Sequence, residues 1–459
     1  MLSHFSDKLL WNHATHHNDI AVHTIIKMKG TLMMNSSWKF SSSPLLSLSG
    51  SCILFFLLEV TAVHGATYYV ATNGSDSNPG SLNQPFRSFA KGVSKLQPGD
   101  TLYIRGGIYT EQLDLQTPNK TGTAGNYLTI AGYPGETVTI RHSNTSVASY
   151  GSIKARGNRG YLKFENLVLD GTDLGNKTSG MQLRDGNHHI ILRNIEIKNH
   201  KGTALGITAN NIEVVNCIFH DNTSEVDQAG ERHYGIYFRE GSNVLIDSNK
   251  IYGNSGGGIQ VYPGPASNSI IRNNEIHHNN NMTSSNNEGI IVMQSLGNTI
   301  TNVSVYNNLI YLNGVNQPGY AHSGGIRVTN GVSGTKIWNN TIYGNKGWGV
   351  AIESSNTINS LVQNNIVYGN SAGQITDAGT DSILSNNLSV DPKFIRPDSF
   401  DFRVQAHSPA IDGGIDLTEV LIDFRKVSRP KGTAHDIGAY EHDGLDKLSV
   451  SAPKDLLIQ

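Results

Sequence analysis

One short phrase recurs through the middle of this chain and restricts the folds that the chain can adopt. In it an Asn is followed by a variable residue, usually then by an aliphatic residue and often by an aromatic residue or His, as in Asn249-Lys250-Ile251-Tyr252. Successive copies are 22 to 34 residues apart and begin at Asn166, Asn194, Asn216, Asn249, Asn274, Asn308, Asn340, Asn365 and Asn387. A repeat of this length that tolerates insertions indicates a solenoid, in which loops of variable length leave the corners of stacked coils.

Two further apolar runs in each period identify the kind of coil. A Gly-aliphatic-variable-aliphatic phrase, such as Gly235-Ile236-Tyr237-Phe238, comes about half a period before the Asn phrase, and a third run, such as Asn243-Val244-Leu245-Ile246, lies between them. Apolar and variable residues alternate in these runs, as in strands with one buried face, and no segment of the repeats keeps a helical period. We therefore predict an all-β fold, a parallel β-helix solenoid with three strands per coil and coils ~4.8 Å apart.

The recurrent Asn residues have a structural interpretation in such a fold. An Asn at a fixed corner can donate its side-chain amide to the Asn of the next coil, and it tolerates the left-handed backbone that a corner requires. We therefore predict that the Asn column holds the coils together and is not a binding site.

The two ends of the chain lack the repeat. Residues 1–65 combine a patternless, His-rich start, an apolar run around Cys52 and the small residues of Val63-His64-Gly65, which fits a signal segment cleaved before Ala66. We expect a secreted, extracellular or cell-surface protein with no membrane span in its mature form, because the alternative, a membrane anchor, would need a longer apolar run. The mature chain would keep only Cys217, so we expect neither a disulfide nor a cysteine metal site.

The remaining sequence divides into four parts. Residues 66–110 are predicted to form an N-terminal cap and the first coil, and residues 111–390 the β-helix. The cap would contain an amphipathic helix from about Phe86 to Leu96 that covers the open end of the solenoid. Residues 391–442 are predicted to cap the far end, and residues 443–459 to form a loose tail.

The N-terminal part carries a resemblance to a known group of proteins. The segments from Tyr68 to Gly80 (YYVATNGSDSNPG) and from Gln97 to Tyr109 (QPGDTLYIRGGIY) resemble the N-terminal module of secreted right-handed parallel β-helix proteins of the pectate-lyase-like superfamily, which includes the family-nine pectate lyases. The resemblance extends over residues 66–442 and implies a right-handed coil. It does not carry over pectate lyase chemistry, because the calcium-binding aspartate cluster and the lysine base of those enzymes have no counterpart at the outward positions of the repeats.

Chemistry on a β-helix is expected on an outer face, since packed side chains fill the coil interior. Alignment of the Gly phrases gives a first outward column of Gln182, Gly206, Tyr237, Gln260, Ile291, Arg327 and Ala351. A second column, two residues further along each strand, consists of Arg184, Thr208, Arg239, Tyr262, Met293, Thr329 and Glu353. Long insertions at 221–232 and 279–287 precede the middle coils and are expected to wall a groove.

The middle coils hold our candidate site. We predict catalytic roles for His233, Tyr237 and Arg239, and substrate contacts for Gln260, Tyr262, Glu288 and Arg327. Cleavage of a uronate by β-elimination requires a group that offsets the substrate carboxylate, a base that removes the neighbouring proton, and a proton donor for the leaving oxygen. Arg239, Arg327 or Gln260 could hold the carboxylate, His233 or Arg239 could be the base, and Tyr237 or Tyr262 could pass the proton.

Three functions remain open from the sequence. The first is a polysaccharide lyase that acts as a monomer on an acidic polysaccharide. The second is a non-catalytic glycan-binding or surface protein, and the third is a glycoside hydrolase or uronate epimerase. Hydrolysis requires two facing carboxylates, and only Glu288 and Glu353, about two coils apart, qualify.

Charge and loop composition limit the partners. A net charge of −2 gives no attraction to nucleic acid, so we expect no nucleic-acid partner. No cofactor is indicated with certainty, and calcium is the one ion that oxygen-rich loops could bind weakly. One such loop holds Asp221, Glu225, Asp227 and Glu231; the loop around Asp76 is another, although we interpret the latter as a simple turn.

Overall fold

The computed structural model describes residues 65–142, 151–174, 178–223, 233–279, 288–295, 297–314 and 324–444. Nearly all of the predicted leader, and residues 445–459 of the predicted tail, lie outside these ranges. No helix within them has the length and apolar character needed to cross a membrane.

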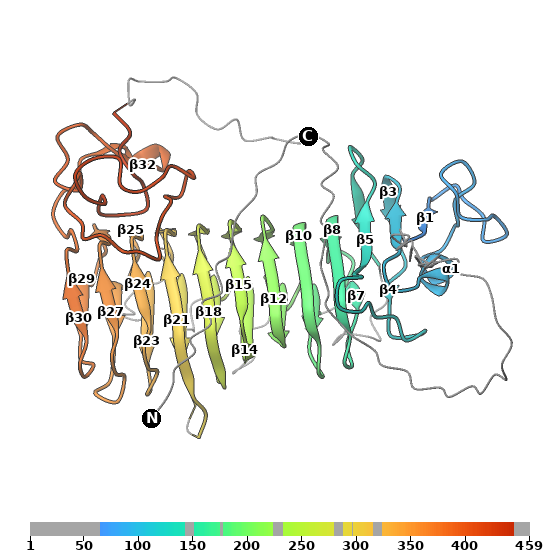
Figure 1. Cartoon of the computed structure of the whole chain (residues 1–459), viewed down its shortest axis with the longest axis horizontal. Helices are drawn as coiled ribbons and strands as arrows, with labels where there is room; N and C mark the ends of the chain where they lie inside the picture. The colour runs from blue at the N-terminus through green and yellow to red at the C-terminus, as the bar shows by residue number, and fades with distance from the viewer. Residues whose placement is uncertain are drawn as a thin grey trace, which may run out of the picture. The chain divides into compact units, whose positions relative to one another are not determined.

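One coil shows the plan of the repeats. Strands β14 (Ile236–Ser242), β15 (Val244–Asp247) and β16 (Lys250–Tyr252) follow one another around the coil, and each pairs in parallel with strands of the coils before and after it. Stacking of the coils therefore produces three ladders of parallel strands, which we name the β14, β15 and β16 ladders, and Figure 1 shows the stack from the side. The predicted all-β parallel β-helix with three strands per coil is confirmed.

The other strands of the β14 ladder are β4 (Leu113–Asp114), β7 (Ile153–Lys154), β9 (Met181–Leu183), β11 (Leu205–Thr208), β17 (Ile259–Val261), β20 (Ile290–Met293), β23 (Ile326–Thr329), β26 (Trp348–Ile352) and β29 (Gly373–Asp377). The β15 ladder also contains β1 (Thr67–Val70), β2 (Thr101–Ile104), β5 (Leu128–Gly132), β12 (Asn210–Val215), β18 (Ala266–Arg272), β21 (Ile300–Tyr306), β24 (Lys336–Trp338), β27 (Leu361–Gln363) and β30 (Ile383–Ser385). The β16 ladder also contains β3 (Gly107–Tyr109), β6 (Val138–Ile140), β13 (Ile218–His220), β19 (Glu275–His277), β22 (Leu309–Tyr311), β25 (Thr341–Tyr343) and β28 (Ile366–Tyr368). Two long strands, β8 (Gly160–Asp170) and β10 (His188–Lys198), turn the corner between the β15 and β16 ladders and belong to both.

The interior of the coils is an apolar core. Alternate residues of each strand point inward, as Ile236, Phe238, Ile246 and Ile251 do in the coil of β14, and all four side chains are at most 1% exposed. Outward residues are consequently the only ones on these strands that can meet a ligand, as the alternating pattern predicts.

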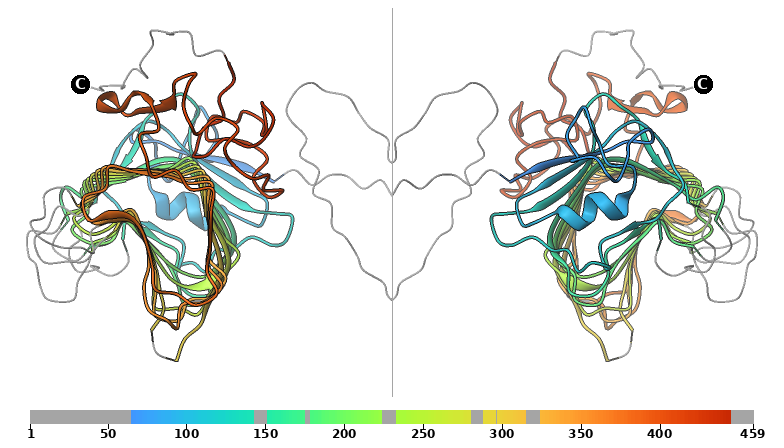
Figure 2. Two further views of the ribbon diagram at one scale, coloured as in Figure 1. Left: turned by 90° about the vertical axis from the view of Figure 1, so that its left-hand side faces the viewer. Right: turned by 90° about the vertical axis from the view of Figure 1, so that its right-hand side faces the viewer.

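A short helix closes the N-terminal end. Helix α1 (Phe89–Lys95) starts after Ser88, whose side chain accepts a hydrogen bond from the Lys91 amide, and it buries Phe89 and Val93 against the end of the core. Figure 2 shows α1 within the outline of the coils. The helix is shorter than predicted because Phe86 forms a β-bridge with Val70.

The Asp76 loop is a turn tied to this helix. Oδ1 of Asp76 accepts hydrogen bonds from the backbone amides of Arg87 and Ser88, each at 2.9 Å, and Oδ2 accepts one from Oγ of Ser88 at 2.7 Å. These bonds hold the pKa of Asp76 below its usual value although desolvation opposes them. Because both carboxylate oxygens of Asp76 already accept hydrogen bonds from the protein, the loop fits our interpretation of it as a simple turn.

The Asn corner contains two columns where the sequence suggested one. A buried column runs from Asn249 through Asn274, Asn308 and Asn340 to Asn365, and each side-chain amide donates to the Oδ1 atom of the next Asn at 2.9–3.0 Å. An outer, exposed column includes Asn166, Asn194 and Asn216, whose φ angles of 54–55° are left-handed. In the coil before Asn249, Cys217 occupies the position of the buried Asn, so the buried column ends there. The sequence alignment took Asn216, one residue earlier and in the outer column, as the counterpart of Asn249, and so joined the two columns.

The C-terminal segment lies along the side of the last coils. It contains β31 (Phe394–Arg396), a short 3-10 helix η2 (Pro397–Ser399) and β32 (Asp401–Val404), and it follows the outer Asn corner. Asn307, Asn339 and Asn364 donate to its backbone carbonyls. We expected this segment to cover the far end of the stack; instead it packs laterally (Figures 1 and 2), and Ile383 and Leu384 of β30 remain 54% and 42% exposed.

Candidate functional site

The first predicted outward column is present on the β14 ladder. Strand pairing aligns Gln182 with Gly206, Gly206 with Tyr237, and then Gln260, Ile291, Arg327 and Ala351 on successive coils. A Cβ atom on Gly206 would overlap the side-chain amide of Gln182. The glycine therefore leaves room for the Gln182 side chain to lie over the coil of Gly206. The alignment of the Gly phrases is therefore confirmed for this column.

The second predicted column is broken by a β-bulge. The register between β11 and β14 shifts after Ile207, so that Thr208 pairs with Glu240 and not, as we predicted, with Arg239. An extra residue in one strand of a pair turns the following side chains to new directions. Further along, Met293 pairs with Thr329 as the column requires.

Tyr237 and Arg239 form the centre of the site. The Arg239 guanidinium lies over the Tyr237 ring, 5.4 Å from its centroid, and the Tyr234 ring lies 5.5 Å from that of Tyr237. Arg239 is exposed, and within the described residues no carboxylate forms an ion pair with it. A cation held against a phenol and open to solvent can bind an anionic ligand while the phenol stays within reach of that ligand.

The other predicted residues differ in accessibility. Tyr262 is half-buried and stands next to Arg239, because its backbone amide bonds the Phe238 carbonyl while the Arg239 carbonyl accepts from Gly264, each at 3.0 Å. Gln260 and His233 are buried, at 3% and 5% exposure. His233, the predicted base, therefore offers little surface to a polymer.

Arg327 is engaged within the protein. Its Nη1 atom lies 3.2 Å from Oε1 of Glu288, and its Nε atom lies 2.8 Å from Oε2 of Glu353. Glu288 precedes β20 and Glu353 follows β26, so one guanidinium bridges carboxylates that belong to the coils on either side of it. This group of three carries a net negative charge when both carboxyls are ionised, which opposes the role in carboxylate binding that we predicted for Arg327.

Glu288 is the carboxyl most affected by its surroundings. Its side chain is 2% exposed, and its Oε2 atom is buried without a hydrogen-bond partner among the described residues. Burial raises the pKa of Glu288 to about 7, and the nearby Arg327 opposes this rise only in part. A carboxyl that exchanges its proton near neutral pH is suited to proton transfer.

A column of stacked rings on the β16 ladder was not predicted. His220, Tyr252, His277 and Tyr311 follow one another on four coils, with ring centroids 4.8–5.1 Å apart and planes within 13° of parallel. Phe400 of the C-terminal segment stacks on Tyr311 at 4.9 Å. The signal was the aromatic or His residue that ends each Asn phrase, which pairs with its counterparts on adjacent strands.

The described residues give little support for a metal site. They contain no group of three or more His, Cys, Asp or Glu side chains placed to hold an ion. Asp221 pairs with Nδ1 of His220 at 2.7 Å, whereas Glu225, Asp227 and Glu231 lie outside the described residues, as do most of the two insertions expected to wall a groove. Calcium binding by that loop stays a prediction.

Comparisons with known proteins agree with this architecture. Residues 68–232 match the family model described as Pel9A-like, right handed beta helix region, and residues 226–389 match the model described as right handed beta helix region. The chain is a right-handed β-helix protein of the pectate-lyase-like type. Its resemblance to this group, stated above on the N-terminal motifs, is thereby confirmed.

Two sequence matches and one structural match show what this β-helix protein is similar to. The uncharacterized protein YwoF of Bacillus subtilis is 28% identical over 348 residues, which is 70% of this chain and 73% of that protein. Pectate lyase PEL9 of Emericella nidulans is 34% identical over 93 residues, and the match spans only 20% of this chain and 22% of that enzyme. The crystal structure of pectate lyase Pel9A superposes with a TM-score of 0.60 and 19% identity over 82% of this chain and 96% of that structure, a likeness that concerns the fold.

Proposed function

We propose that this protein is a lyase that cleaves a uronate-containing polysaccharide by β-elimination on the outer face of the β14 ladder. The observation that carries the proposal is the exposed Arg239 guanidinium on the Tyr237 ring, with Tyr262 beside it on the next coil. The similarity of 93 residues of this chain to PEL9, and of the fold to Pel9A, supports a polysaccharide as the substrate.

The chemistry assigns a role to each of these groups. Arg239 binds the uronate carboxylate in a two-pronged contact and so makes the proton on the neighbouring carbon acidic. A base removes this proton, a carbon–carbon double bond forms, the bond to the glycosidic oxygen breaks, and that oxygen takes a proton. Tyr237 lies against Arg239 and is our candidate for the proton relay, with His233 as a candidate base if substrate binding opens its surroundings.

The location of the protein is part of this proposal. A substrate polymer of this kind lies outside the cell, which agrees with the signal segment predicted in residues 1–65. We propose that the mature protein starts at Ala66 and acts in the extracellular space or at the cell surface.

The first test measures the unsaturated product. The purified protein is incubated with pectate, alginate or glycosaminoglycans, with calcium or with a chelator, and the ultraviolet absorbance of the new double bond is followed. We expect a rise with one class of polymer and a loss of at least 100-fold in Arg239→Gln, about 2.7 kcal/mol of transition-state stabilisation. Arg193→Gln removes another exposed arginine, on β10, and should leave the rate unchanged.

One observation favours glycoside hydrolysis as a second candidate. Glu288 and Glu353 both bond Arg327, so two carboxyls lie within reach of one another, and Glu288 has the raised pKa of an acid catalyst. Hydrolysis would release new reducing ends without ultraviolet absorbance. If no polymer gives either ultraviolet absorbance or new reducing ends, the remaining function is that of a non-catalytic glycan-binding protein.

A further inference from the structure

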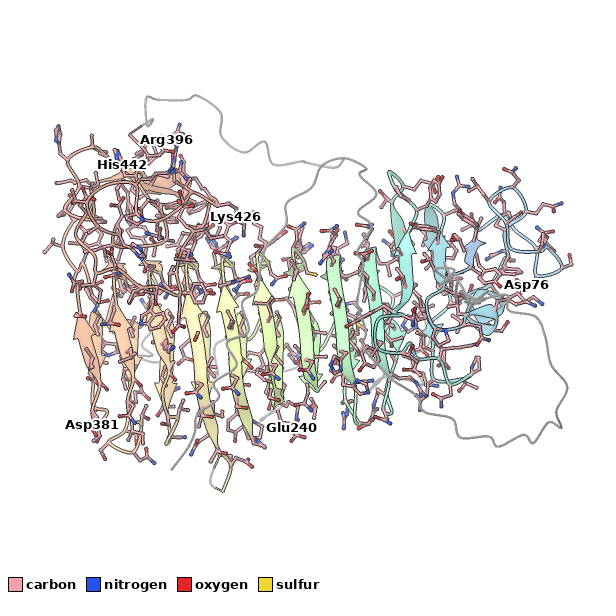
Figure 3. All side chains as sticks on the ribbon, in the orientation of Figure 1. Asp76, Glu240, Asp381, Arg396, Lys426 and His442 are labelled. Atoms are coloured by element: carbon pink, nitrogen blue, oxygen red, sulfur yellow. The ribbon has the colours of Figure 1, made fainter. Side chains whose placement is uncertain are left out.

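A polar groove follows the corner between the β14 and β15 ladders. It has a volume of about 670 Å³ and is formed by five consecutive coils. Its lining includes Asp185, Thr208, Glu240, Pro265, Ser267 and Thr299. Figure 3 labels Glu240 at the lower corner of the coils, on the edge opposite the C-terminal residues Arg396, Lys426 and His442.

This groove borders the candidate site directly. The Arg239 carbonyl accepts a hydrogen bond from the Gly264 amide at 3.0 Å, and the residue after each of them, Glu240 or Pro265, lines the groove. The β-bulge of β14 places Glu240 opposite Thr208 at this corner. A polymer that lies in the groove along the stack therefore passes Arg239 on its way.

The walls of the groove suit hydroxyl groups. Thr208, Ser267, Thr299 and Thr301 contribute hydroxyls that bond no other described residue, while the Oδ1 atom of Asn210 accepts from the amide and hydroxyl of Ser242 at 2.8 and 3.0 Å. A hydroxyl both donates and accepts, and can therefore exchange hydrogen bonds with the hydroxyls of a sugar. Successive coils repeat these groups every ~4.8 Å, over a length on the order of 19 Å.

The charges of the groove oppose a uronate inside it. No Lys or Arg is among its lining residues, whereas two carboxylates are. Asp185 is offset by Arg156, whose Nε atom lies 2.7 Å away, but Glu240 forms no ion pair within the described residues. A run of substrate carboxylates along the groove would meet Glu240 without a compensating cation.

We propose that this groove binds a stretch of the polysaccharide that carries fewer carboxylates than a polyuronate, next to a uronate that Arg239 holds. The inference rests on the proposed function and narrows its substrate class: the polymer contains neutral sugars as well as uronates. Polyuronates such as pectate or alginate, with a carboxylate on every unit, are then poorer ligands than a glycosaminoglycan such as hyaluronan, in which a uronate alternates with an uncharged sugar.

A binding assay tests the groove apart from the chemistry. The full protein is run through gels that contain hyaluronan or alginate, and retardation gives the two affinities. Ser267→Trp fills the groove and should weaken hyaluronan binding about tenfold or more. The control is Ser333→Trp. Ser267 pairs with Thr301, and Thr301 pairs with Ser333, so the two serines belong to one column, but Ser333 lies outside the groove.

A second variant tests the charge argument. Glu240→Lys should raise the affinity for alginate severalfold, because it replaces the unpaired carboxylate by a cation. Thermal unfolding of each variant confirms that it is folded.

The outcomes separate the two proposals. Equal hyaluronan binding by Ser267→Trp and Ser333→Trp, or tighter binding of alginate than of hyaluronan by the unmodified protein, would overturn the groove proposal. Loss of binding in Ser267→Trp without any unsaturated product would support the groove and reject the lyase. Product formation that Ser267→Trp does not affect would support the lyase and reject the groove.

Discussion

At the scale of single residues, the group formed by Glu288, Arg327 and Glu353 has the most unusual electrostatics on the β14 ladder. Arg327 divides its donors between two carboxylates, and one buried oxygen of Glu288 has no partner in the part of the chain that the structure describes. An ionised carboxylate in this position lacks the solvation that it would have in water, which favours the protonated acid. Burial therefore keeps Glu288 protonated over a wider pH range than an exposed glutamate.

The raised pKa of Glu288 makes stability depend on pH. From its usual 4.5 to about 7, the folded protein keeps a proton that the unfolded chain has lost, so the free energy of unfolding falls as the pH rises through this window. Between pH 5 and pH 8 the native protein should lose about 2 kcal/mol relative to Glu288→Gln, which has no proton to release. Urea unfolding of both proteins at the two pH values measures the difference.

A carboxyl of the opposite kind provides the control for that series. Glu136 bonds Arg105, which lowers the pKa of Glu136 below its usual 4.5. It is therefore ionised in both folded and unfolded states from pH 5 to pH 8, and Glu136→Gln should shift stability equally at both. A Glu288→Gln difference that stays constant with pH would show that Glu288 is ionised in the folded protein.

At the scale of the structural element, the Asn corner divides two tasks between neighbouring columns. The outer Asn residues adopt the left-handed backbone of the corner, and the buried ones satisfy backbone groups of adjacent coils. The Oδ1 atom of Asn308, for example, accepts from the amide and the side chain of Asn274, while its Nδ2 atom donates to the Ile271 carbonyl and to Asn340. Such a side chain is fully satisfied only when both neighbouring coils are in place.

Truncation of one buried Asn should therefore be costly. Asn308→Ala takes the acceptor from the backbone amide of Asn274, and an orphaned buried group costs about 1–3 kcal/mol. It also removes one hydrogen bond each from Nδ2 of Asn274, the Ile271 carbonyl and Oδ1 of Asn340, at about 1 kcal/mol each. We expect a loss of about 3 kcal/mol or more, measured as a lower urea midpoint. In the outer column, Asn194→Gly keeps the positive φ and should change stability by only about 0.5 kcal/mol. Equal losses in both variants would contradict the division of tasks.

The β14 ladder shows what the sequence could predict about the fold and the site. Strict alternation of buried and outward residues, together with the Gly phrase, sufficed to place Tyr237, Gln260 and Arg327 in one column. The β-bulge that displaces Arg239 from Thr208 could not be predicted from the sequence, because the extra residue does not change the pattern of the repeat. The two ion pairs of Arg327 were also missed, since they depend on side-chain directions that a register does not determine.

At the scale of the whole molecule, the buried cation of Arg429 organises the part of the C-terminal segment that contacts the coils. The Arg429 side chain is 0% exposed and donates to Oε2 of Glu441 and to the Gly438 carbonyl, each at 2.7 Å. Asn339 of the coils donates to the carbonyls of Asp436 and Gly438. Arg429 bonds the same Gly438 carbonyl, so it holds the turn that contacts the coils. This contact is lateral, and it joins residues about a hundred positions apart in sequence.

Removal of that cation should detach the segment while the repeats stay folded. Arg429→Met leaves the Glu441 carboxylate, also 0% exposed, buried without its guanidinium, which costs about 3–5 kcal/mol. Limited trypsin digestion should then cut after Lys393, Lys426 or Lys431 and leave a resistant core that ends near residue 390. The double variant Arg429→Met/Glu441→Gln removes the unpaired charge and should recover part of the resistance. If Arg429→Met instead makes the repeats sensitive at the same rate as the segment, the two fold as a single cooperative unit, and the coils depend on this lateral contact for their own stability.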